Sequence, residues 1–109
     1  MTDPWTYTAD VVRWLDANPP KQGDPVTLRL LKIAEEYGEA AQAYFGVTAQ
    51  NPRKGATHTP ADVADELCDV ILAAMVALHD HVPDPQDFFQ AFVRSHAQRQ
   101  AALTERSES

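Results

Sequence analysis

Apolar residues recur at helical spacing along four stretches of the chain, and residues that favour turns separate these stretches. The first stretch predicts a helix from Pro4 to about Ala17, capped by Asp3. Its apolar side would carry Trp5, Val11, Val12, Trp14 and Leu15. Residues 18–25 contain three prolines and a glycine, so they are expected to form the turn that ends this helix.

The second stretch predicts a helix from Pro25, capped by Asp24, to about Phe45, just before Gly46. Its apolar arc comprises Leu30, Leu31, Ala34, Tyr37, Ala41, Tyr44 and Phe45. Glu35, Glu36 and Glu39 fall on a separate arc. Taken alone, this is an ordinary amphipathic helix whose glutamates form its polar side.

The third stretch has a good helix start, because Thr59 can cap, Pro60 suits the first position and Asp62 suits the third. The helix is expected to run to about His79. Beyond Asp69 it has no polar face, so we expect it to be buried on all sides. Cys68 is then best interpreted as a small buried thiol.

The fourth stretch predicts a helix from Pro85, capped by Asp84, to about Leu103, with the inner face Phe88, Phe89, Phe92 and Val93. Residues 104–109 are expected to form a disordered tail. The prediction is therefore one all-α domain over residues 1–109, a four-helix-type bundle. Because helix three has apolar surface to spare, we expect homo-oligomerisation to complete the bundle.

Composition narrows the classes of function. The 109 residues carry 9 Lys and Arg against 16 Asp and Glu, a net charge of −7, which argues against a nucleic-acid polymer as partner. The longest apolar run has nine residues, 70–78, too few to span a membrane. A single cysteine and an N-terminus without a signal-peptide pattern favour a cytoplasmic protein.

The candidate chemistry lies in two acidic helix turns. Glu36 and Glu39 are three residues apart, as are Glu66 and Asp69, so each pair projects from one side of its helix. If the two helices pack about 8–10 Å apart, four carboxylates converge, and their repulsion favours a bound cation. Oxygen ligands without a Glu-x-x-His pair point to Mg²⁺, with Mn²⁺ as a substitute, and not to zinc or iron.

Residues 47–59 form a polar connection that carries Arg53, Lys54 and His58 in an otherwise acidic chain. Arg53 and Lys54 are candidates to bind substrate phosphates. The alternative, that this is a solvated loop with incidental cations, is equally open.

These motifs resemble those of the MazG-like nucleotide pyrophosphohydrolases, in the all-α NTP pyrophosphatase superfamily. The family pattern of EExxE, a spacer and ExxD stands here as Glu35-Glu36-x-x-Glu39 and Glu66-x-x-Asp69. The resemblance covers roughly residues 25–80.

The resemblance implies a helical homodimer or homotetramer that hydrolyses a nucleoside triphosphate to the monophosphate and pyrophosphate with Mg²⁺. By position, Glu36, Glu39, Glu66 and Asp69 would bind the metal, and Glu35 with Glu36 would be catalytic, Glu35 helping to hold a metal or to orient the attacking water. A specialisation for dUTP or dCTP is a narrower form of this hypothesis. Two alternatives are a weakly active helical regulatory module that keeps the acidic patch, and a structural bundle whose acids are merely solvated.

Overall fold

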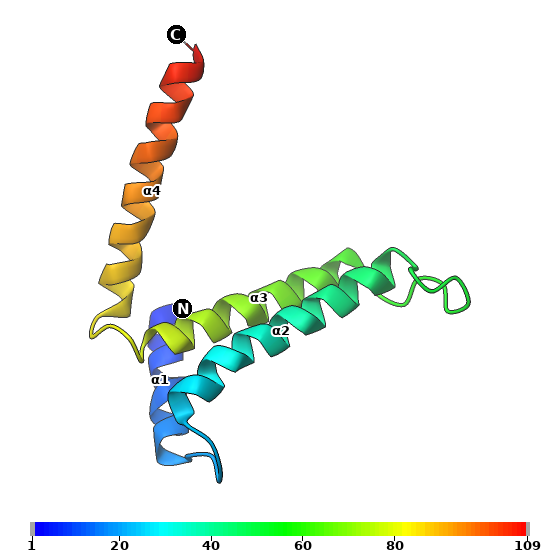
Figure 1. Ribbon diagram of the computed structural model, residues 1–109, viewed down its shortest axis with the longest axis horizontal. Helices are drawn as coiled ribbons and strands as arrows, with labels where there is room; N and C mark the ends of the chain where they lie inside the picture. Colours follow the sequence, from blue (N-terminus) through cyan, green and yellow to red (C-terminus); the bar gives the residue numbers. More distant parts are fainter. Residues whose placement is uncertain (1, 109) are drawn as a thin grey trace.

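The computed structural model describes residues 2–108, which form four helices and, within that range, no strand. The helices are α1 (Pro4–Ala17), α2 (Pro25–Val47), α3 (Pro60–Leu78) and α4 (Pro85–Glu108) (Figure 1). The predicted all-α class is confirmed. None of the described helices is long and apolar enough to cross a membrane.

Local capping explains where the first three helices begin. The Asp3 carboxylate accepts a hydrogen bond from the Thr6 amide at 2.9 Å, and Asp24 accepts one from the Thr27 amide at 3.0 Å. Thr59 and Asp62 form a reciprocal capping box at the start of α3. Each of these helices has a proline in its first turn, as predicted.

Two predicted helix ends are wrong. Helix α2 continues through Gly46 to Val47. Gly46 does not end the helix; it is a point at which the connection to α3 comes close to α2, because the Thr57 amide donates a hydrogen bond to the Gly46 carbonyl at 2.9 Å. Helix α4 continues to Glu108, so residues 104–108 are helical where a tail was expected. The last residue of the expected tail, 109, lies outside the described residues.

Helices α2 and α3 lie side by side and antiparallel, and form the most extensive helix contact (Figure 1). The buried apolar residues of these two helices are small, namely Ala40 and Ala43 on α2 and Ala77 on α3. The predicted inner face of α2 is therefore wrong for the single chain. Its large members are exposed, namely Leu30, Leu31, Tyr37, Tyr44 and Phe45.

Helix α3 is not buried on all sides, because its extensive contacts within the chain are with α2 and, to a smaller extent, with α1. Leu67 is 47% exposed and Ile71 is 58% exposed. Cys68 is also exposed, which corrects the expectation of a buried thiol.

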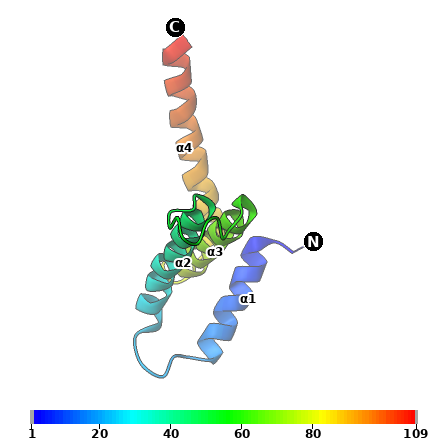
Figure 2. The same ribbon diagram turned by 90° about the vertical axis from the view of Figure 1, so that its right-hand side faces the viewer.

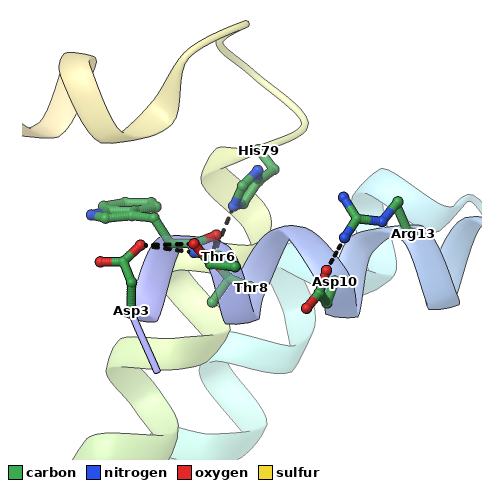
Figure 3. A network of polar contacts seen from close by, with 7 residues as sticks. Asp3, Thr6, Thr8, Asp10, Arg13 and His79 are labelled. Carbon is green, nitrogen blue, oxygen red and sulfur yellow. Dashed lines mark hydrogen bonds and ion pairs between the residues drawn. The ribbon is translucent and has the colours of Figure 1, made fainter. Parts of the chain in front are cut away.

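Helix α1 is attached to the end of the α2–α3 pair by polar contacts. Thr8 is fully buried, and its hydroxyl lies 2.9 Å from Nε2 of His79, at the C-terminal end of α3 (Figure 3). The Arg29 guanidinium bridges Asp16 of α1 at 2.7 Å and Asp80 at 2.5 Å. These contacts tie α1 to both other helices at one end of the pair.

Helix α4 projects away from the other three helices (Figures 1 and 2). Its first turns approach α1 through the rings of Phe89 and Trp5, whose centroids are 5.9 Å apart. The expected inner face of α4 is wrong in the single chain, because each of its members is between 43% and 52% exposed: Phe88, Phe89, Phe92 and Val93.

Candidate metal centre

Three of the predicted metal ligands meet between α2 and α3. Glu36, Glu39 and Glu66 each offer a carboxylate oxygen, and these oxygens lie within 4.8 Å of one another. Ala40 and Ala43, which follow these glutamates on α2, are small and buried, and this is compatible with a close approach of the two helices. Among residues 2–108, it is the one group of three or more His, Cys, Asp or Glu side chains gathered this tightly.

Two of these carboxylates are incompletely satisfied. Oε2 of Glu36 and Oε2 of Glu66 are buried without a hydrogen-bond partner. The Glu36 side chain is only 12% exposed. Buried charged oxygens without partners are costly, and a hard cation among three carboxylates would satisfy them. The donor set therefore fits a divalent ion with oxygen ligands.

The electrostatics of the centre show how crowded its negative charge is. The negative charge of Glu36, followed by desolvation and contributions from Glu66 and Glu35, raises the pKa of Glu39 above its ordinary value. The crowding is relieved on one side by Lys32, whose Nζ lies 3.1 Å from Glu36 and 3.3 Å from Glu35. The hydrogen bond to Glu36 raises the pKa of Lys32, so its ammonium form is favoured.

The fourth predicted ligand, Asp69, is exposed and is not among the three that meet. It lies one turn beyond Glu66 on α3. Together with Glu36 it lines a cavity between α1, α2 and α3. Asp69 thus borders the centre on the side of this cavity.

Glu35 is not one of the three carboxylates that meet. Its side chain is 59% exposed, and its carboxylate pairs with Lys32. The motif's two adjacent glutamates therefore have different environments, one nearly buried and one facing solvent.

The structure does not bring Arg53 and Lys54 to the acids. Both are exposed in the connection between α2 and α3, and neither lines the cavity that Glu36 and Asp69 share. The Arg53 backbone amide donates to Asn51 Oδ1, which is a local turn contact. The predicted phosphate role of these two residues has no support from this geometry.

Sequence reasoning missed Lys32 as the cation of the site. The available signal was its spacing: a lysine four residues before Glu36 lies on the same side of a helix.

Comparison with protein-family models, curated proteins and solved structures finds no match to this chain.

Proposed function

We propose that this protein is a Mg²⁺-dependent nucleoside triphosphate pyrophosphohydrolase, which converts a (d)NTP and water to a (d)NMP and pyrophosphate. The observation that carries the proposal is the pair of buried, unpartnered oxygens of Glu36 and Glu66, set beside Glu39. The resemblance to the MazG-like enzymes supplies the reaction, and the helix pair supplies a geometry compatible with it.

Each residue then has a defined task. Glu36, Glu39 and Glu66 hold the metal, and Asp69 completes the set from the cavity side. Bound Mg²⁺ would supply positive charge to the phosphate oxygens of the triphosphate, the main need of such transfers. Glu35, which faces solvent, orients the attacking water. Water adds to the α-phosphorus, and the bond from that phosphorus to the bridging oxygen of pyrophosphate breaks.

Lys32 is the structure's best candidate for a cation that binds substrate phosphate. In the single chain its ammonium group neutralises Glu35 and Glu36. A metal ion at the cluster would take over that neutralisation. Lys32 would then be free to pair with a phosphate oxygen at the mouth of the cavity.

A homo-oligomer is part of the proposal. The chain exposes 8282 Å² of surface, against about 6,000 Å² for a compact monomer of its mass. The difference matches what one subunit contributes to a large homodimer interface. Many of the exposed large apolar residues lie on α2, α3 and α4, where a second copy of the chain would cover them.

The same exposed apolar surface favours one competing function, a weakly active regulatory module that binds a different partner protein. A measurement of nucleotide hydrolysis distinguishes the enzyme from this regulatory module. The third alternative, a structural bundle with solvated acids, is disfavoured because Glu36 is nearly buried.

The test is to incubate the protein with each NTP and dNTP and Mg²⁺, and to assay pyrophosphate and orthophosphate separately. We expect pyrophosphate release that is lost with EDTA and in Glu66→Gln. The matched control is Asp65→Asn, on the same helix and outside the cluster. Orthophosphate release would refute the reaction, and no product from a folded protein would favour the regulatory module.

A further inference from the structure

One face of α2 is apolar, free of charge and largely exposed along most of the helix. Its central residues alternate spacings of four and three, the heptad spacing of helices that pack against another helix: Leu30, Ala34, Tyr37, Ala41 and Tyr44. Tyr37, in the middle of this face, is 65% exposed, more than any other large apolar side chain among residues 2–108. An apolar seam of this length indicates a surface that another helix covers.

The order of large and small residues along this face is the same from either end. Four pairs are equidistant from its midpoint, which lies between residues 37 and 38: Leu30 with Phe45, Leu31 with Tyr44, Ala34 with Ala41, and Tyr37 with Gly38. We call these eight residues the α2 stripe. In a two-fold symmetric contact, residue i meets residue j and j meets i, so the surface must be complementary to itself. The α2 stripe has this property when two copies run antiparallel.

Charge also favours a second copy on the α2 stripe. The chain has a net charge of −7, so most contacts between two copies would bring like charges together. The α2 stripe carries no charge, and its neighbours Glu36 and Glu39 gather with Glu66 of α3. At its centre there is room for a partner's ring, because a Cβ on Gly38 would meet nothing within 4 Å.

The α2 stripe is separate from the other concave surfaces of the described chain. None of its eight residues lines the cavity that Glu36 and Asp69 share. None borders the apolar hollow that Ile71 and Phe92 help to form between α3 and α4. A second copy bound to the α2 stripe therefore occupies neither of them.

We propose that α2 packs antiparallel against α2 of a second copy, with the two-fold axis between Tyr37 and Gly38. Each Tyr37 ring then lies over Gly38 of the partner subunit. Leu30 lies beside Phe45 of the partner subunit and about 22 Å from Leu30 of the partner subunit, which is fifteen residues at 1.5 Å each. The inference rests on the homo-oligomer of the proposed function and names the helix, direction and register of one of its contacts.

Disulfide formation between introduced cysteines tests this register. Every variant carries Cys68→Ser, because the native thiol is exposed. Under mild oxidation, Gly38→Cys should form a covalent dimer, because the two Cα atoms come within the roughly 4.4–6.8 Å that a disulfide spans. Leu30→Cys alone should not, whereas an equal mixture of Leu30→Cys and Phe45→Cys should link the two different chains. Ala64→Cys, at an exposed position on α3, is the matched control and should remain uncrosslinked.

Association provides a second measurement that needs no cysteine. In sedimentation equilibrium, Ala34→Glu should weaken association by about tenfold or more, because it places a charge in the apolar contact. Ala64→Glu makes the same change at an exposed position on α3 and should not weaken association. Circular dichroism checks that both variants remain helical. The Gly38→Cys dimer should still form in Phe92→Glu, because Phe92 is not part of the α2 stripe.

Three results would overturn the inference: no covalent dimer of Gly38→Cys, efficient linking of Leu30→Cys to itself, or unchanged association of Ala34→Glu. The second of these would mean that the two helices run parallel. If the cysteines link as expected but no pyrophosphate is released from any triphosphate, the proposed reaction fails while the α2 contact stands. If pyrophosphate is released but the cysteines do not link, the α2 contact fails while the reaction stands.

Discussion

At the scale of single residues, Lys32 lies beside the carboxylates of the candidate metal centre. Its ammonium group lies 3.1 Å from Glu36, so it competes with any cation that the carboxylates bind. The Lys32 side chain is half exposed, and repulsion between two unit charges about 4 Å apart is worth about 1 kcal/mol when water screens them fully, which is roughly fivefold in affinity.

We therefore expect Lys32→Met to tighten Mn²⁺ binding about fivefold and to raise the KM for triphosphates. Isothermal titration calorimetry and steady-state kinetics measure the two effects. Lys54→Met, an exposed loop lysine, should change neither. Weaker metal binding in Lys32→Met would show that Lys32 organises the carboxylates and does not compete with the ion.

Arg29 tests a second residue-scale claim, that a buried ion pair joins α2 to the turn that follows α3. The side chains of Arg29 and Asp80 are only 10% and 12% exposed, and Asp80 Oδ2 is buried without a partner. Arg29→Ala should lower the free energy of unfolding by about 3 kcal/mol, because it leaves a buried carboxylate uncompensated. In urea unfolding, Arg13→Ala is the control: its exposed pair with Asp10 should contribute less than about 1 kcal/mol. Equal effects would refute the claim.

At the scale of helices, the two glycines of α2 have opposite surroundings. A Cβ on Gly46 would lie 2.0 Å from Nδ1 of His58 and 2.6 Å from the Thr57 hydroxyl, whereas a Cβ on Gly38 would meet nothing within 4 Å. Gly46→Ala should therefore lower the melting temperature, since the side chains of His58 and Thr57 must move. Gly38→Ala should stabilise the helix by about 0.5–1 kcal/mol through propensity alone. A stabilising Gly46→Ala would contradict the close approach.

The helices also show what sequence alone could establish. Helix starts were predictable because caps such as Asp3 and Thr59 act on amides only three residues away. Contacts such as Thr8 with His79, 71 residues apart, leave no local signal. The motif spacing predicted that four carboxylates would meet, and three of them do, whereas Asp69 does not. It could not predict which face of α2 packs on α3, because α2 has both a large apolar arc and a small-residue face with Ala40 and Ala43.

At the scale of the whole molecule, the chain is too extended to be a compact monomer. Its radius of gyration is 18.1 Å, against about 13 Å for a compact domain of this length. Between α3, α4 and Trp5 lies an open apolar hollow, bordered by Ile71, Phe88 and Phe92 among others. A second copy that covers this hollow would explain why α4 projects from its own chain.

We accordingly expect a dimer or larger assembly at micromolar concentration in sedimentation velocity. Phe92→Glu should weaken association at least tenfold, because it places a charge in an apolar interface. Gln100→Glu, farther along α4 on its exposed surface, is the matched control. A wild-type protein that sediments as a folded monomer would contradict the homo-oligomer.

The most direct test of the central claim is a Mn²⁺ titration followed by electron paramagnetic resonance, with Mn²⁺ standing in for Mg²⁺. The account predicts specific Mn²⁺ binding that falls by about tenfold or more in Glu36→Gln and in Glu66→Gln, and persists in Asp65→Asn. Binding that the two glutamine variants retain in full, or a folded wild-type protein that binds no Mn²⁺, would contradict the metal centre.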